Sequence, residues 1–403
     1  MPGPLPDGDP VPRDGSLPPS SLGAVGARGF GVYVHVPFCA SRCGYCDFNT
    51  YTASDGVVAD GYGDVVLGEL ALARRVLGDG PPQVDTVFFG GGTPTLLAPA
   101  ELGRILDGID RAWGLAPHAE VSTEANPESV SPSSLRALRD SGFTRISLGM
   151  QSAAPDVLAV LDRRHTPGRA AAAATEARDA GFAHVNLDLI YGTPGETAAD
   201  FAASLAMVLD AGVDHVSAYA LIVEEGTRLA ARMRRGELPY PDDDVAADRY
   251  LAADYTLSGA GFDWYEVSNW ARSDADRCRH NLLYWTGGDW WGLGPGAHSH
   301  VDGVRWWNVK HPHAYGARVA AGESPGQARE VLLPEQRHAE DVLLRLRLAD
   351  GLPLSTLDKA GLAAAKRALG DELLDPRAYA DQRAVLTLRG RLLADAVVRD
   401  LLP

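Results

Sequence analysis

The sequence lacks the features that would carry it into a membrane or out of the cell. No run of about eighteen apolar residues occurs in its 403 residues, so a transmembrane helix is not supported. The first part of the chain also lacks a charged region followed by an apolar one, which argues against a secretory signal peptide. We therefore expect a cytoplasmic protein with no membrane span, and peripheral association with a membrane stays open.

Positive charge is in short supply. The chain has 37 Lys and Arg against 53 Asp and Glu, a net charge of -16. This balance repels phosphate backbones and anionic lipid surfaces. We therefore expect no nucleic-acid partner.

Cysteine is scarce as well. Only four cysteines occur, and three of them lie between residues 39 and 46, with Cys278 far away. A disulfide framework would need more cysteines, spread along the chain. The crowded group instead favours a metal site in a reducing compartment.

Composition divides the chain into four parts. Residues 1–28 are rich in Pro, Gly, Ser and Asp and predict a disordered tail, because they have too little apolar surface to offset their ordering entropy. Residues 29–262 alternate strand-like and helix-like segments. Residues 263–330 form an aromatic, Gly-rich extension that holds seven of the eight tryptophans. Residues 331–403 predict a small, mostly helical C-terminal domain, similar to a winged helix.

Six apolar runs rich in β-branched residues predict the strands of residues 29–262. They lie near residues 31, 84, 119, 144, 184 and 215. Their alternation with helical segments predicts an α/β fold, a partial (β/α)6 TIM-like barrel. An open doubly wound sheet is the alternative. In either fold, functional side chains gather at the carboxyl ends of the strands.

Three cysteines follow the first predicted strand in the pattern CxxxCxxC. Thiolates of Cys39, Cys43 and Cys46 at this spacing can hold three corners of a cubane iron-sulfur cluster. No fourth cysteine is near, so one iron would stay open to a small molecule. Zinc is the alternative, but it prefers four closed ligands, often as two matched pairs.

The cysteine pattern resembles the signature of the radical S-adenosylmethionine (SAM) superfamily. There the open iron of a [4Fe-4S] cluster binds SAM, and one electron splits it into methionine and a 5′-deoxyadenosyl radical. The run FFGGGTP at residues 88–94 resembles the loop that holds the methionine part of SAM, because its glycines allow close approach of the backbone. The resemblance implies both cofactors and an electron donor for the cluster.

Further segments resemble one branch of this superfamily, the oxygen-independent coproporphyrinogen III oxidases and the related HemW-type heme chaperones. The segments YVHVPFC, FFGGGTPTLL, EANPE, RISLGMQS and NLDLIYGTPGET carry the resemblance, which covers nearly the whole chain after the tail. By these motifs the resemblance implies that SAM contacts Tyr33, Tyr45, Gly91, Gly92, Thr93, Glu124, Gln151, Arg163, Asp188 and Ala220. A surface ion pair for Arg163 and a strand-end cap for Asp188 are the alternatives.

Two features separate the branches. The oxidases carry a further cysteine two positions after the third, where this chain has Phe48. Residues 280–285 match the HNxxYW motif of the chaperones, and the resemblance implies that His280 binds heme among aromatic rings. A hydrogen-bonded core histidine is the alternative. The weaker candidates for the heme ligand are Cys278, His298 and His300.

The function that the resemblance implies is that of a heme chaperone. Such a protein binds heme as cargo and transfers it to heme-requiring proteins. The alternative is a coproporphyrinogen III oxidase, which decarboxylates propionates by radical chemistry, but the sequence shows no dedicated cluster of cations for propionates. Radical modification of an RNA base is disfavoured by the acidic balance.

Overall fold

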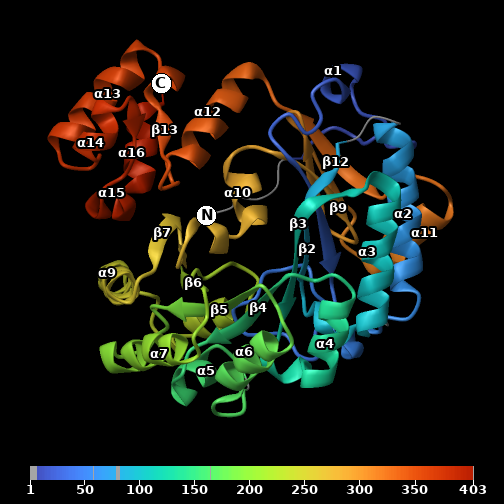
Figure 1. Ribbon diagram of the computed structural model, residues 1–403, viewed down its shortest axis with the longest axis horizontal. Helices are drawn as coiled ribbons and strands as arrows, with labels where there is room; N and C mark the ends of the chain where they lie inside the picture. The colour runs from blue at the N-terminus through green and yellow to red at the C-terminus, as the bar shows by residue number, and fades with distance from the viewer. Residues whose placement is uncertain (1–6, 58, 79–81, 164, 403) are drawn as a thin grey trace.

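Six parallel strands form the centre of the fold (Figure 1). The computed structural model describes residues 7–57, 59–78, 82–163 and 165–402. The strands are β1 (Phe30–Val36), β2 (Val84–Gly91), β3 (Leu115–Ala125), β4 (Arg145–Gln151), β5 (His184–Tyr191) and β6 (His215–Ala220). Each pairs in parallel with the next, so the order lacks the reversal of a doubly wound sheet. The predicted partial (β/α)6 barrel is therefore confirmed.

Helices cover the outer side of the curved sheet (Figure 1). They are α2 (Tyr62–Leu77), α3 (Pro99–Trp113), α4 (Pro132–Asp140), α6 (Arg169–Asp179), α7 (Ala198–Asp210) and α9 (Asp243–Gly259). The short helices α5 (Pro155–Val160) and α8 (Arg228–Arg234) share a separate apolar cluster beside the cysteine loop. Local sequence sets their starts: Ser131, Thr197 and Asp242 each accept a backbone N–H of the first turn of α4, α7 and α9. Among the described residues, no helix is long and apolar enough to cross a bilayer.

Side chains alternate along the six strands between the helix-covered side and the barrel interior. Val87, Ile146 and Leu187 belong to the apolar core between sheet and helices. The intervening positions of β2 to β6 are mostly polar, namely Thr86, Glu120, Ser122, Glu124, Arg145, Ser147, Asn186, Asp188, His215 and Ser217, and many of them hydrogen-bond to one another. A closed barrel fills this space with branched apolar side chains. Here the interior is a polar chamber.

The aromatic extension adds strands to both edges of the sheet. β7 (Asp263–Glu266) and β8 (Asn269–Ala271) continue it beyond β6, and β9 (Asp289–Leu293) pairs in parallel with β1. β10 (His298–Val301), β11 (Val304–Asn308) and β12 (Gly326–Val331) follow as antiparallel strands, with α11 (Pro312–Ala320) between the last two. The extension thus shares one sheet with the barrel, and α10 (Arg279–Trp285) lies on the inner side of the curve (Figure 1).

The C-terminal part has a core of its own and is mostly helical, as predicted. It comprises α12 (Pro334–Arg345), α13 (Lys359–Gly370), α14 (Pro376–Ala380), α15 (Leu388–Leu392), α16 (Ala394–Leu401) and a small sheet of β13 (Leu352–Pro353) and β14 (Arg383–Ala384). It is fastened to the barrel by Arg391, whose guanidinium binds both carboxylate oxygens of Asp254 at 2.8 and 3.0 Å. Such a bidentate pair fixes orientation as well as distance.

The predicted disorder of the N-terminal tail is wrong for residues 7–28; residues 1–6 lie outside the described part. Asp9 exchanges two backbone hydrogen bonds with Arg329 of the edge strand β12, at 2.7 and 2.8 Å. The segment includes α1 (Pro19–Leu22), and Leu17 is buried against the core. Composition alone could not predict this order. The prolines lower the entropy cost of ordering the segment, and the edge of the sheet supplies its hydrogen-bond partners.

The order of the tail predicts a measurable contribution to stability. Leu17→Ala should lower the free energy of unfolding by about 2 kcal/mol, the lower end for a buried leucine. Urea denaturation measures this difference. Leu22→Ala, at a residue of the same segment that is 36% exposed, is the matched control and should have little effect. If the Leu17 variant were as stable as the parent protein, Leu17 would not be packed against the core, and the prediction of a disordered tail would stand.

Candidate functional site

The three clustered cysteines lie in the loop between β1 and α2. All three are free thiols and half-buried. The loop is held on two sides: Cys39 N donates to Tyr51 O at 2.9 Å, and Gly44 is bonded through its N–H to Leu161 O and through its carbonyl to Leu229 N, at 3.0 and 2.8 Å. These bonds fix the backbone that carries the thiols at the carboxyl end of the barrel.

The thiols are in surroundings that favour a bound metal. Burial raises the pKa of Cys39, and it raises the pKa of Cys46 to about 11, each thiolate also being disfavoured by the charge of a neighbouring one. A metal centre removes this penalty because its positive charge holds the thiolates. Cys278, the other cysteine of the described chain, is buried among the residues at the amino ends of the strands. The donor set therefore fits a cluster held by three thiolates with one iron open.

The glycine run at the end of β2 forms a wall against the cysteine loop. Thr93 N donates to Phe38 O at 2.7 Å, and the Thr93 hydroxyl faces the Cys39 sulfur at 3.9 Å. A Cβ on Gly92 would lie 2.5 Å from Phe38 O, and Gly91 has a φ of +107°. Glycine is needed here because the strand end and the cysteine loop touch backbone to backbone.

Two carboxyl groups face the same chamber. Glu124 accepts the Gly91 N–H at 2.9 Å, and Asp188 accepts the Ser147 hydroxyl at 2.9 Å and the Asn186 amide at 2.6 Å. Burial, followed by the charge of Asp188, raises the pKa of Glu124 to about 7, and burial also raises the pKa of Asp188. Such a pair favours a ligand that brings hydroxyl or ammonium donors.

Arg163 lies beside Cys43, one of the three neighbouring thiols. Its Nη1 donates to Cys43 Sγ at 3.3 Å and its Nη2 donates to Gly149 O at 3.0 Å, so the alternative of a surface ion pair is excluded. Gln151, at the end of β4, has a φ of +66° and follows a register shift in that strand. Strain of this kind in a residue other than glycine is common at functional sites.

The remaining predicted SAM contacts lie at different depths. Tyr45 sits between the thiols, and its ring packs on the apolar cluster that includes Leu161. Ala220 ends β6 at the rim. Tyr33 lies deeper, where its hydroxyl pairs with His35 Nδ1 at 2.9 Å and its ring stacks on Phe88. The structure therefore places Tyr33 in the chamber wall and not against the thiols.

Sequence reasoning missed His35. Its Nε2 pairs with Asn49 O at 2.9 Å, which ties β1 to the loop after the cysteines. A Cβ on Gly91 would lie 2.5 Å from the His35 ring, so the ring fills the space that this glycine leaves. The signal in the sequence was its position two residues after Tyr33, which puts both side chains on the same face of a strand.

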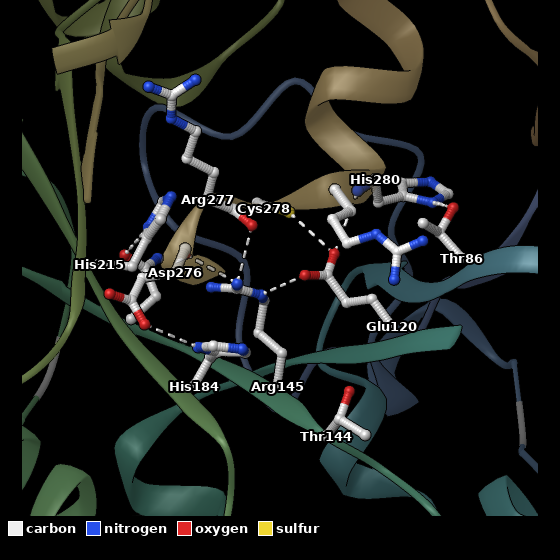
Figure 2. A network of polar contacts seen from close by, with 12 residues as sticks. Thr86, Glu120, Thr144, Arg145, His184, His215, Asp276, Arg277, Cys278 and His280 are labelled. Atoms are coloured by element: carbon white, nitrogen blue, oxygen red, sulfur yellow. Dashed lines mark hydrogen bonds and ion pairs between the residues drawn. The ribbon is translucent and has the colours of Figure 1, made fainter. Parts of the chain in front are cut away.

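A buried ion pair closes the amino end of the barrel (Figure 2). Arg145 Nε donates to Glu120 at 2.9 Å, and both side chains are almost fully buried. Arg145 also donates to the backbone carbonyls of Asp276 and Arg277, at 2.8 and 3.1 Å. Glu120 accepts the His280 N–H at 3.1 Å, in the first turn of α10. The pair thus holds the segment that leads into α10.

His280 is a buried, hydrogen-bonded residue in this structure. Its Nδ1 pairs with the Thr86 hydroxyl and its Nε2 with the Tyr284 hydroxyl, both at 2.8 Å, and its ring stacks on Phe88. Burial lowers its pKa to about 4, so the ring is neutral. With both ring nitrogens engaged, the residue matches the core-histidine alternative, and binding of a heme iron would require one of these bonds to break.

The other predicted heme ligands differ in accessibility. Cys278 is 4% exposed, and its thiol faces Glu120 at 3.6 Å. Burial raises its pKa, so the thiolate is disfavoured. Backbone groups occupy both ring nitrogens of His300. His298 is exposed, and its ring stacks on Trp307.

A known protein family has a model that matches the part of the chain that carries this site. The family model for the Radical SAM superfamily matches residues 33–208, the part that carries the cysteine motif, the glycine run and both carboxylates. Three thiols and these groups at the carboxyl ends of parallel strands thus define a radical SAM protein, a class that uses a [4Fe-4S] cluster and SAM.

Comparison with whole proteins identifies the branch. The heme chaperone HemW of Mycobacterium tuberculosis (strain ATCC 25618 / H37Rv) is 58% identical over 93% of this chain and 95% of its own length. HemW of Bacillus subtilis (strain 168) is 33% identical over 79% of this chain and 84% of its own. The structure of coproporphyrinogen III oxidase (HemN) from Escherichia coli aligns with a TM-score of 0.80 at 24% identity, covering 95% and 92% of the two chains, a likeness of fold. The chain belongs to the HemW heme chaperone family.

The cysteine geometry predicts which thiols hold iron. Replacement of Cys39, Cys43 or Cys46 by Ala should remove most of the iron bound after anaerobic reconstitution, because three thiolates are the whole protein ligand set. Cys278→Ala is the matched control and should keep its iron. Iron and acid-labile sulfide analysis measures both. Full iron content in a triple variant would contradict the assignment.

The carboxyl pair predicts a pH-dependent stability. The folded protein keeps the Glu124 proton up to about pH 7, whereas an unfolded glutamate loses it near 4.5, so this group lowers the free energy of unfolding as pH rises between those values. Glu124→Gln should therefore stabilise the cluster-free protein by about 1–3 kcal/mol at pH 8 and hardly at pH 4.5.

Urea denaturation at the two pH values measures this effect. Glu335→Gln, on the exposed first turn of α12, is the control. If Glu124→Gln were less stable than the parent at pH 8, the folded protein would stabilise the ionised carboxylate, and the prediction would be wrong.

Proposed function

We propose that this chain binds heme and passes it to heme-requiring proteins in the cytoplasm, with a [4Fe-4S] cluster and SAM at the carboxyl end of its barrel. The observation that carries the proposal is the set of three half-buried free thiols beside the glycine wall. The similarity to heme chaperones over almost the full length supports the heme part.

Several residues would hold SAM at the cluster. Cys39, Cys43 and Cys46 would ligate three irons, and the open iron would take the amino and carboxylate groups of SAM. The backbone of Gly91 and Gly92 would border the methionine part. Glu124 would accept from the SAM ammonium group, and Asp188 would accept from the ribose hydroxyls. Contacts are also proposed for Tyr45, Thr93, Gln151, Arg163 and Ala220.

The bound cofactors would supply one-electron chemistry, and the chain would control its surroundings. Arg163 is fixed by its bond to Gly149 O, so its guanidinium would keep positive charge next to the thiolate of Cys43. That charge would stabilise the reduced cluster relative to a neutral side chain. The half-buried chamber would limit water at the reacting end of SAM.

The chamber suits propionate substrates poorly. Glu124 and Asp188 place carboxyl groups in it, and Glu266, whose pKa is raised to about 8 by burial, lies next to Asn281 of α10. Carboxylates of coproporphyrinogen III would be repelled or left unpaired there. Phe48, at the position of the oxidases' additional cysteine, is 61% exposed. The residue at position 48 favours the chaperone over the oxidase, whereas the buried carboxyl groups oppose the propionates of heme and of coproporphyrinogen III alike.

Heme binding is proposed at the HNxxYW segment, with His280 as the axial ligand. Because Thr86 and Tyr284 occupy its ring nitrogens, ligation requires α10 to shift. His298, which is exposed, is the alternative ligand. A helix that must move in order to expose a ligand suits a protein that binds its cargo transiently.

Parallel assays with heme and coproporphyrinogen III test the function. The purified, reconstituted protein should bind heme stoichiometrically in an absorbance titration. His280→Ala should shift the visible bands or weaken binding, because the axial ligand sets the electronic state of the iron, whereas His298→Ala should leave both unchanged. A shift in the His298 variant alone would move the ligand and keep the function.

The same preparation, given SAM and a strong reductant without oxygen, should leave coproporphyrinogen III intact. Catalytic accumulation of protoporphyrinogen would contradict the proposed function and favour the oxidase.

A further inference from the structure

A line of buried hydrogen bonds joins the SAM-facing carboxylate Asp188 to the start of α10. The Asn186 amide donates to Asp188 Oδ1 at 2.6 Å, and Asn186 Oδ1 pairs with His215 Nδ1 at 2.7 Å. His215 Nε2 pairs with the Tyr265 hydroxyl at 2.7 Å, and that hydroxyl accepts the Cys278 N–H at 3.2 Å. Cys278 is the N-cap residue of α10.

Each group in this line has one possible orientation. The Asn186 amide nitrogen faces the acceptors Ser147, Ser217 and Asp188, so its oxygen must face His215. His215 Nδ1 therefore carries the proton. Burial and the charge of Arg145 lower the pKa of His215 well below its usual range, so the ring is neutral and Nε2 is an acceptor.

It follows that the Tyr265 hydroxyl donates to His215 and accepts from Cys278. Every donor in the line then points from α10 toward Asp188. Hydrogen bonds aligned in this way polarise one another, so a change in charge at one end alters the strength of the bond at the other.

The Cys278 end of this line adjoins the hydrogen bonds that hold the segment leading into α10, a region that Figure 2 shows. There Arg145 holds the carbonyls of Asp276 and Arg277, and Glu120 accepts the His280 N–H. The Cys278 N–H lies between these bonds in sequence. The bond to Tyr265 therefore belongs to the same set of contacts that keeps His280 buried.

We propose that His215 and Tyr265 are positioning residues that couple SAM binding at Asp188 to the docking of α10. The inference rests on the SAM site of the proposed function and adds a route from that site to the heme segment. Ribose hydroxyls that donate to Asp188 compete with Asn186 for the same carboxylate. The hydrogen bonds of the line are then less polarised, and the bond from the Cys278 N–H to the Tyr265 hydroxyl weakens. Bound SAM thus loosens α10 and makes His280 available.

Hydrogen-deuterium exchange of the cluster-loaded protein tests the coupling. The cluster is kept oxidised so that SAM stays intact, and SAM binding is measured separately by equilibrium dialysis. SAM should speed amide exchange in residues 279–285 about fivefold, the lower end of typical couplings between sites. Exchange in α13, which lies in the C-terminal core, should not change.

Tyr265→Phe removes the hydroxyl at the middle of the line. SAM should still bind to this variant, but exchange of α10 should no longer respond to SAM. A merely structural role would raise the basal exchange and leave the response to SAM in place. Tyr315→Phe is the matched control, because Tyr315 is also buried and donates to a carboxylate, Glu69, away from this line. It should retain the full response.

The outcomes separate the two claims. SAM binding with unchanged or slowed α10 exchange in the parent protein would overturn the coupling and leave the SAM site standing. A full response in Tyr265→Phe would overturn the roles of Tyr265 and His215. No SAM binding at all would overturn the SAM site and the coupling together.

Discussion

The alternation of side chains along β1 to β6 is the constraint on which the rest of the structure depends. One face of each strand is apolar and buries against the outer helices, so the other face must turn inward. Because that inner face carries polar groups, most of them hydrogen-bond to one another inside the barrel, and the Ser122 hydroxyl is an exception. Glu120 finds Arg145, and Asp188 finds Ser147 and Asn186. The chamber is thus a network whose parts cannot be changed independently.

The two ends of this chamber have opposite electrostatics. At the amino end, the Glu120 carboxylate is neutralised by Arg145 and capped by α10, which locks the HNxxYW segment in place. At the carboxyl end, the thiols and Glu124 have raised pKa values because burial is not compensated by protein charges. Deficits of this kind are typical of sites that wait for a charged ligand. The amino end therefore holds α10 and His280 in their buried arrangement, and the carboxyl end carries the groups that would bind the cluster and SAM.

The features that could be predicted from the sequence are those that a local pattern of residues encodes. The six strands appeared as apolar β-branched runs, and the cysteine and glycine motifs placed the site at the strand ends. Long-range partners were out of reach: the pairing of Asp9 with Arg329 and of β9 with β1 joins residues some 260 to 320 positions apart. The burial of His280 was equally hidden, because Thr86 lies 194 residues away. Its motif shows a histidine among aromatic rings and does not show whether a ring nitrogen is free.

The central claim is that the three thiols hold a cluster whose open iron binds SAM. Electron-nuclear double resonance of the reduced cluster, with SAM labelled with 15N in its amino group, tests this most directly. The account predicts a hyperfine coupling between the cluster and the labelled nitrogen, present in Cys278→Ala. If SAM binds without any such coupling, the iron is closed and the account is wrong.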